Sequence, residues 1–406
     1  MTRAQPADIV STMKHIHPFP ARMAPELALA ALKGIGSGSV VLDPMSGSGT
    51  VLRQASLAGH QAIGFDLDPL AVLISQVSSR AVDLETVEQL LSRVMTSARK
   101  LRLRDAALPW IDASDETREF VLYWFGPKQR HSLRKLAFIL AEESTAPRNS
   151  NVRPELDVLK VALSRTIITK EVGASLARDV SHSRPHKVRD KNDYDVLSGF
   201  ERSTQQVLKY LRGGMPVVSA RSAHGDARKL TRVLDDSIDL IVTSPPYLNA
   251  IDYLRGHKLS LVWLGYSVEN IRQIRSKSIG AERAPDQVPA HDVKEVARAM
   301  IREAHPSNRV QQMITRYAGD VYAMIAEMKR VLRTGGKAVL VVGDSCLQST
   351  FVSNSAAIKK AAQMNGFRLE QQMTRELPTG RRYLPVTGTA LSKRMRVENV
   401  LTFRLA

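Results

Sequence analysis

The stretch "VVLDPMSGSGT", residues 40–50, joins an apolar run to a glycine-rich turn. The run predicts a buried strand over Val40–Leu42. Gly47 and Gly49 permit a tight turn and a close approach of the backbone to a ligand. The following "TVLRQASLAGH" predicts a short helix that ends at Gly59. A strand, a turn and a helix in this order are typical of a parallel sheet covered by helices.

The same rhythm continues along the chain. "QAIGFDLDP" predicts a second strand and "LAVLISQVSSRAV" a second helix. Residues 320–332 have an amphipathic helical pattern, with Val321, Ile325, Met328 and Leu332 on one face. Further strands are predicted in "MPVVSA" (215–220), "DLIVTSPPY" (239–247), "KAVLVVGDS" (337–345) and "VENVLTFRLA" (397–406). The pattern indicates an α/β fold with a Rossmann-like sheet.

The strand pattern is interrupted once over a long distance. From Leu84 to about residue 214 the apolar residues have helical spacing, and a polar, basic segment at 181–193 is expected to be an exposed loop. We therefore expect one α/β domain formed by residues 1–83 and 215–406, divided by a mainly helical insertion at 84–214. A second stretch without strand character, at about 266–316, is rich in charge.

Composition narrows the class of partner. The chain has 406 residues, and 58 Lys and Arg against 40 Asp and Glu give a formal charge of +18. A polyanion such as nucleic acid is the favoured partner, because phosphates attract many spread cations; the alternative is only a basic protein. No run of about 18 apolar residues predicts a membrane span, and the N-terminus lacks the apolar core of a signal peptide, so we expect a cytoplasmic protein.

The chain contains one cysteine, Cys346, which follows a strand-like run. One cysteine forms neither an intrachain disulfide nor a cysteine-rich zinc site, and we expect no metal. Cys346 is expected to be in or near the core.

The glycine turn favours a cationic ligand over a phosphate. It lacks the lysine of a P-loop, and Leu52 stands where a dinucleotide motif would have its third glycine. Asp43 ends the first strand, and Asp66 ends the second, where an acid commonly binds ribose hydroxyls. A cofactor with a ribose and an ammonium group but no phosphate is S-adenosylmethionine. The alternative is a structural turn whose glycines serve packing.

A second loop, "TSPPY" at residues 243–247, follows the predicted strand "DLIV". The strand would bring Ser244–Tyr247 to the carboxyl edge of the sheet, where open α/β sheets bind ligands. Prolines make the loop stiff and donate no N–H, so its carbonyls can accept. The Ser244 hydroxyl and the Pro245 carbonyl could hold a planar amino group, and Tyr247 could stack on a base. The alternative is an ordinary strand end, because prolines often terminate strands.

Together these motifs resemble the DNA methyltransferases that methylate exocyclic amino groups with S-adenosylmethionine. "DPMSGSGT" is similar to the family's cofactor motif, with Met45 in place of the usual aromatic residue, and "TSPPY" to its catalytic motif. "HPFPARMAPELA" (17–28) resembles the segment that precedes the cofactor motif, and "HGDARKL" (224–230) the acidic turn near the adenine. "RVLRTGGKAVLVVGD" (330–344) resembles a later helix–strand unit. The resemblance covers about 15–83 and 215–406.

The resemblance implies a seven-stranded, mostly parallel sheet with one antiparallel strand. It implies that the target base is flipped out of the duplex and that the methyl group passes directly from the sulfonium to the amine. The catalytic residues would be Ser244, Pro245, Pro246 and Tyr247. The cofactor residues would be His17, Phe19, Asp43, Pro44, Ser46, Gly47, Gly49, Thr50, Asp66 and Asp226.

The target and its recognition are less defined. Ser-Pro-Pro-Tyr is commoner among N4-cytosine enzymes but also occurs in N6-adenine enzymes, so N4-cytosine is the first expectation and N6-adenine the alternative. An RNA amine methyltransferase is a further alternative, although no RNA-binding module is recognisable. We expect the insertion 84–214, with or without 266–316, to read duplex DNA, and a cognate restriction endonuclease is a possible partner. Backbone phosphates could be contacted by Arg184, Lys187, Arg189, Arg381 and Arg382.

Overall fold

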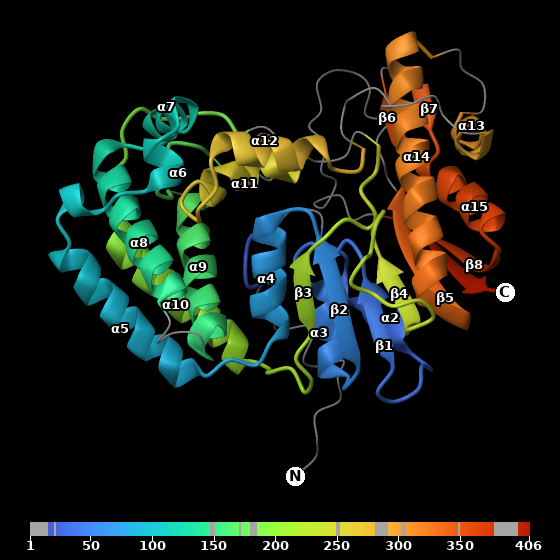
Figure 1. Ribbon diagram of the computed structural model, residues 1–406, viewed down its shortest axis with the longest axis horizontal. Coiled ribbons are helices and arrows are strands. Elements are labelled where there is room, and N and C mark those ends of the chain that lie inside the picture. Colours follow the sequence, from blue (N-terminus) through green and yellow to red (C-terminus); the bar gives the residue numbers. More distant parts are fainter. Residues whose placement is uncertain are drawn as a thin grey trace. The chain divides into compact units, whose positions relative to one another are not determined.

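The computed structural model describes residues 15–19, 22–146, 151–169, 172–178, 185–248, 252–280, 291–301, 306–347, 350–376 and 397–406. The chain divides into two compact units, which are described separately (Figure 1). A helical unit comprises residues 1–20, 68–219 and 252–274. A sheet unit comprises residues 21–67, 220–251 and 275–406. None of the described helices is long and apolar enough to cross a lipid bilayer.

The sheet unit is built on seven strands in the order β3-β2-β1-β4-β5-β9-β8. Strands β1 to β5 pair in parallel, β9 runs antiparallel to both of its neighbours, and β8 therefore runs with the others. The bounds are β1 Val40–Asp43, β2 Gln61–Asp66, β3 Arg221–His224, β4 Ile238–Thr243, β5 Leu332–Gly343, β8 Phe367–Glu376 and β9 Val397–Leu405. The predicted α/β fold, with its seven strands and one antiparallel strand, is confirmed.

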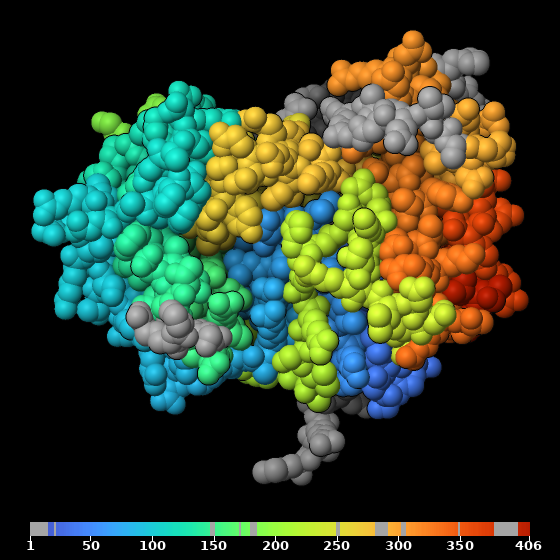
Figure 2. All heavy atoms as spheres, in the orientation of Figure 1, coloured from blue at the N-terminus to red at the C-terminus, as the bar shows by residue number. Residues whose placement is uncertain are grey.

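Alternation along the central strands assigns side chains to the two faces of the sheet. Leu42 and Ile241 belong to the core that contains α13 His291–Ala299, α14 Asn308–Val331 and α15 Asn354–Met364. Val41 and Leu240, their neighbours in sequence, belong to the core with α2 Pro25–Leu32 and α3 Thr50–Leu57. Both faces are thus covered, which explains why these strands read as continuous apolar runs. In the space-filling view the yellow-green β3–β4 region lies against the blue strands β1 and β2 (Figure 2).

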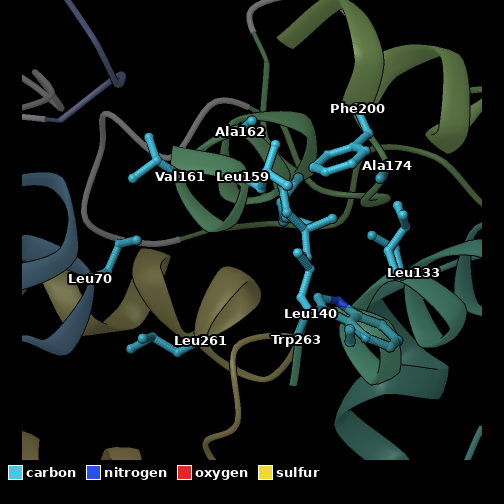
Figure 3. Close-up of a cluster of buried hydrophobic side chains, with 14 of the residues drawn as sticks. Leu70, Leu133, Leu140, Leu159, Val161, Ala162, Ala174, Phe200, Leu261 and Trp263 are labelled. Atoms are coloured by element: carbon cyan, nitrogen blue, oxygen red, sulfur yellow. The ribbon is translucent and has the colours of Figure 1, made fainter. Parts of the chain in front are cut away.

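The helical unit is held together by its own apolar core. Trp263, Phe200 and Leu133 are almost completely buried there (Figure 3). Between residues 84 and 214 the described chain forms helices and a single isolated β-bridge, between Ala177 and Lys187. The described helices of the whole helical unit are α4 Pro69–Ser79, α5 Leu84–Lys100, η1 Leu103–Asp105, α6 Pro109–Asp112, α7 Asp115–Trp124, α8 Pro127–Thr145, α9 Arg153–Ile167, α10 Val196–Arg212, α11 Tyr253–Leu261 and α12 Val268–Ser276. The last of these, α12, extends two residues beyond the unit.

Two sequence-based expectations are wrong. Residues 215–220 form no strand; Val217 is 73% exposed there, and β3 begins only at Arg221. Cys346 is exposed rather than near the core, because it lies on the short hairpin of β6 Ser345–Leu347 and β7 Thr350–Val352, outside the main sheet. Apolar residues indicated a strand at 215–220, and the preceding strand indicated burial of Cys346, but neither position belongs to the seven-stranded sheet.

Candidate active site at the carboxyl edge of the sheet

The parallel strands bring the predicted motifs to one edge of the sheet. Strands β1, β2, β3 and β4 are neighbours and run in the same direction, so the loops that follow them emerge together. Asp43 and Asp66 are the last residues of β1 and β2. Asp226 follows β3, and Ser244 follows β4. This edge is where open α/β sheets bind their ligands.

The loop after β1 is anchored to β2. The Gly47 N–H donates to Asp66 Oδ2 at 2.8 Å, and the Ser46 N–H donates to the Phe65 carbonyl at 2.8 Å. Gly47 and Gly49 have φ values of 49° and 80°, in the left-handed region that favours glycine. Gly49 then begins α3 as its N-cap, so Thr50 is the first helical residue. Both glycines are therefore required by the backbone, whatever the loop binds.

Asp43 lies beneath this loop. Its side chain accepts from the Thr243 hydroxyl at 2.7 Å and from the Met45 N–H at 3.2 Å. Burial is the largest influence and raises the pKa of this carboxyl from 3.8 to about 7, although both hydrogen bonds lower it. The Thr243 contact directly joins the glycine motif after β1 to the start of the Ser-Pro-Pro-Tyr motif after β4.

One polar atom in the glycine loop has no partner. Ser46 is 6% exposed, and its Oγ atom makes no hydrogen bond to any part of the chain that the structure describes. A buried hydroxyl without a partner is costly in an isolated protein. It indicates a place where a ligand could supply the missing hydrogen bond.

Asp226 lies in an ion-pair network. Arg228 donates to both Asp226 oxygens, at 2.6 Å from Nη2 to Oδ2 and 2.9 Å from Nε to Oδ1, and it also pairs with Asp320 of α14. Burial favours the neutral acid, but the Arg228 hydrogen bonds and charge outweigh it, so the pKa of Asp226 lies below its usual value. Asp226 is therefore charged, and Arg228 links it to Asp320 of α14.

The Ser-Pro-Pro-Tyr loop is held by three side-chain hydrogen bonds. Ser244 donates from Oγ to the Val341 carbonyl of β5 at 3.0 Å. The Tyr247 hydroxyl donates to Glu398 Oε1 of β9 at 3.3 Å. The Pro246 carbonyl accepts from the Tyr317 hydroxyl of α14 at 3.0 Å. The loop is thus fixed by strands on one side and a helix on the other.

The two N-terminal cofactor candidates belong to the helical unit. His17 is 6% exposed and forms a 2.9 Å hydrogen bond from Nε2 to Ser164 Oγ of α9. Phe19 stacks on Tyr253, with ring centroids 5.4 Å apart and planes inclined by 26°. Both side chains are packed within their own unit, and their role at the cofactor stays a prediction.

The predicted DNA contacts are only partly described. Arg184, Arg381 and Arg382 lie outside the described residues. Lys187 pairs with Asp190 at 2.9 Å and lies 5.4 Å from the centre of the Tyr123 ring, and Arg189 is half-buried. The basic segment is tied to the chain around residue 177, since Val188 N–H donates to the Leu176 carbonyl at 3.1 Å. Hydrogen bonds thus hold the described residues 186–188 to residues 176–178, and the DNA contacts of Lys187 and Arg189 stay a prediction.

Sequence reasoning did not single out Thr243, Arg228 or Tyr317. Tyr317 lies four residues before Val321, so it continues the buried stripe of α14, and a hydroxyl on a buried stripe needs a partner. The sequence therefore contained a signal for Tyr317. It contained no signal that Thr243 pairs with Asp43 or that Arg228 pairs with Asp320, because the two residues of each pair are distant in sequence.

The described residues hold no group of three or more His, Cys, Asp or Glu side chains arranged to bind a metal ion. Comparison with protein-family models gives no match. The chain is 24% identical over 387 residues to type II methyltransferase M.AvaI of a Nostoc species, covering 84% of this chain and 75% of that protein. It is 22% identical to type II methyltransferase M.BsoBI of Geobacillus stearothermophilus, over 61% of this chain and 51% of that protein.

Likeness to solved structures is weak. A putative DNA modification methylase from Thermus thermophilus, complexed with S-adenosyl-L-methionine, is 19% identical over 44% of this chain and 53% of that one, with a TM-score of 0.24. That score is too low to support an argument. The chain is a low-identity relative of type II methyltransferases, and its sheet has the seven strands and the single antiparallel strand that the resemblance to S-adenosylmethionine-dependent methyltransferases implies.

Proposed function

We propose that this protein is a DNA methyltransferase that transfers a methyl group from S-adenosylmethionine to the exocyclic N4 amine of cytosine in duplex DNA. The observation that carries the proposal is the hydrogen bond between Thr243 and Asp43, which joins a cofactor-type loop to an amine-binding loop at one sheet edge. The similarity to type II methyltransferases over 84% of the chain supports it.

The residues at the edge fit the cofactor. Asp43 is a buried carboxyl suited to an ammonium group, Ser46 offers a buried hydroxyl without a partner, and Asp66 is an acid at the end of β2 suited to ribose hydroxyls. Asp226 would lie near the adenine. When bound, the cofactor supplies a methyl group on a positively charged sulfur. Its positive charge suits an edge that carries two acids, Asp43 and Asp66.

The protein's part in the reaction is mainly positioning. The Ser244 hydroxyl and the Pro245 carbonyl would accept the two amine hydrogens, so that the nitrogen lone pair faces the methyl group. Tyr247 would stack on the flipped base, which contributes about 1–3 kcal/mol. The amine would gain the methyl group of the sulfonium in place of one of its own protons, which would pass to water, while the protein's groups hold the amine in position. Fixed geometry of this kind can supply much of the rate enhancement.

The proposal also covers the target base, the part of the chain that reads the DNA sequence, and the location and partner of the protein. Ser244 in the first motif position favours N4-cytosine by resemblance, with N6-adenine as the alternative and an RNA amine as a more distant one. Residues 84–214 would read the DNA sequence, because a specific enzyme needs a surface for base edges. A cytoplasmic location and a restriction endonuclease that cuts the same site fit this role.

The test is to incubate the purified protein with duplex DNA of random sequence and S-adenosylmethionine carrying a labelled methyl group. Digestion to nucleosides and mass spectrometry would identify the methylated base. We expect N4-methylcytosine, and a labelling rate lowered by roughly ten- to a thousandfold with Ser244→Ala under the same conditions. If N6-methyladenine is found instead, the target base of the proposal changes from cytosine to adenine and the rest of the proposal stands. A parallel incubation uses RNA in place of DNA. Label in the RNA and none in the DNA would overturn the DNA proposal.

A further inference from the structure

Tyr317 contacts the candidate catalytic loop from outside the motif. It lies on α14, is 1% exposed, and donates a hydrogen bond of 3.0 Å to the Pro246 carbonyl, 71 residues away in sequence. Its ring belongs to the core on that face of the sheet. A buried hydroxyl is expensive unless it is paired, so the loop carbonyl and the tyrosine stabilise each other.

The hydroxyl remains a donor over the whole working range of pH. Burial, with a smaller contribution from Asp320 and Asp344, raises the pKa of Tyr317 far above its ordinary value. The group therefore stays protonated. An O–H that stays protonated can only direct its hydrogen toward the acceptor that it faces, which is the Pro246 carbonyl.

The hydrogen bonds of the loop distinguish polar groups that already have a partner from those that can still accept a hydrogen bond. Ser244 uses its hydrogen on the Val341 carbonyl, so its oxygen can only accept from a further partner. The Pro246 carbonyl is already engaged by Tyr317. Within the described chain, no hydrogen bond is made to the Pro245 carbonyl. The Ser244 hydroxyl oxygen and the Pro245 carbonyl, from consecutive residues, can therefore both accept from an incoming amino group.

The neighbouring Gly280 restricts the same loop. A Cβ atom at Gly280 would lie 3.4 Å from the Tyr247 carbonyl oxygen and 3.7 Å from the Tyr317 ring. The Gly280 N–H donates to Asp320 Oδ2 at 3.4 Å, one helical turn beyond Tyr317. The loop is thus packed closely against α14 on this side, and a displaced Tyr317 contact would be felt directly by residues 246 and 247.

We propose that Tyr317 is a positioning residue of the reaction: its hydroxyl holds the Pro246 carbonyl, and so fixes the loop in the conformation in which Ser244 and Pro245 present acceptors to the target amine. This inference rests on the proposed function. Tyr317 touches neither the base nor the cofactor in this proposal. It acts through the loop, and its loss should affect the rate of methyl transfer more than the binding of either substrate.

The experiment compares Tyr317→Phe with Tyr322→Phe. Tyr322 lies on the same helix and donates to Asp292 Oδ2 at 2.7 Å, so its variant loses one paired hydroxyl away from the loop. For each protein we would measure the single-turnover rate of DNA methylation, the Kd for S-adenosylmethionine by calorimetry, and Tm. Rates are expressed per cofactor-binding protein, which removes any unfolded fraction.

We expect Tyr317→Phe to lower the single-turnover rate by about ten- to a hundredfold, because small displacements of reacting groups are costly. Its cofactor Kd should stay within about twofold of the wild type, and Tyr322→Phe should keep the wild-type rate. An unchanged rate for Tyr317→Phe overturns the inference. So does a loss of cofactor binding in step with the rate, which would make Tyr317 merely structural. Inactive wild-type protein would instead overturn the proposed function.

Discussion

At the scale of single residues, Asp43 links the stability of the protein to pH. Its folded pKa of about 7 lies above the ordinary 3.8, so the folded protein holds this proton more tightly than the unfolded chain. The stabilising contribution is fully present below about pH 4 and is lost as the pH rises toward 7. In the cofactor-free protein this loss should amount to a few kcal/mol.

Asp43→Asn should remove this pH dependence, because an amide keeps an acceptor for Thr243 but does not ionise. Thermal denaturation of both proteins at a series of pH values from 4 to 8 tests it. The wild type should lose Tm relative to the variant across that range. A constant difference between the two curves would show that Asp43 ionises normally. The variant should also bind S-adenosylmethionine more weakly, having lost the charge for the ammonium group.

Ser244 and Tyr247 should affect chemistry more than folding. Ser244→Ala removes one of the two acceptors for the amine and should cut turnover by roughly ten- to a thousandfold. Tyr247→Ala should weaken capture of the flipped base, whereas Tyr247→Phe loses the 3.3 Å hydrogen bond to Glu398 but keeps the ring, and should stay largely active. Cofactor affinity and Tm should change little in all three.

A 2-aminopurine probe at the target position measures the capture step, because its fluorescence rises when the base leaves the stack. Tyr247→Ala should reduce that rise, and Tyr247→Phe should preserve it. If Tyr247→Ala methylates DNA at the wild-type rate, residues 244–247 are only the end of a strand.

At the scale of elements, the glycine loop depends on β2 as well as β1. Asp66 holds the loop through the Gly47 N–H at 2.8 Å, and it is also the proposed ribose ligand. Asp66→Ala should weaken binding of S-adenosylmethionine by about 1–3 kcal/mol through lost hydrogen bonds to a charged group. Asp66→Asn keeps an acceptor for Gly47 and should lose less. Calorimetry of both variants separates the role of Asp66 in holding the loop from its role as a ribose ligand. If both variants bind S-adenosylmethionine with wild-type affinity, Asp66 does not contact the cofactor.

The elements that could be predicted from the sequence are those with a clear apolar pattern, either continuous along a strand or at helical spacing. β1 and β4 were clear because their runs are continuously apolar, and α14 because Val321, Ile325 and Met328 recur at helical spacing. β8 gave no such signal: it is an edge strand, most of its residues are exposed, and it lacks a continuous apolar run.

The contacts that organise the candidate site could not be predicted at all. Thr243 and Asp43 are 200 residues apart, and Pro246 and Tyr317 are 71 apart. Local patterns indicate that a residue is buried, but the partner of a buried hydroxyl depends on how the sheet brings distant loops together. Motif resemblance pointed to loops that the sheet brings to one edge, while the residues that support these loops needed the structure.

At the scale of the whole molecule, the open question is which part reads the DNA sequence. Residues 84–214 hold much of the helical unit's core, but they also depend on 252–274. Trp110 Nε1 donates to the Val262 carbonyl at 2.8 Å, and Ser114 Oγ donates to Glu269 Oε1 at 2.9 Å. An exchange of 84–214 alone would break these contacts, because a relative's helices would meet unmatched partners.

Two chimeras with a relative that methylates a different site therefore form the test. One exchanges 84–214, and the other exchanges 84–214 together with 252–274, which keeps the Trp110 and Ser114 contacts within one parent. We expect the methylated sequence to follow the exchanged segments while the methylated base stays that of the recipient, because the catalytic loop at 244–247 is unchanged. Sequencing that detects methylated bases in DNA from cells expressing each chimera reports both. If the folded second chimera still methylates the recipient's site, the reading surface lies outside both segments, and residues 275–316 are the next to exchange.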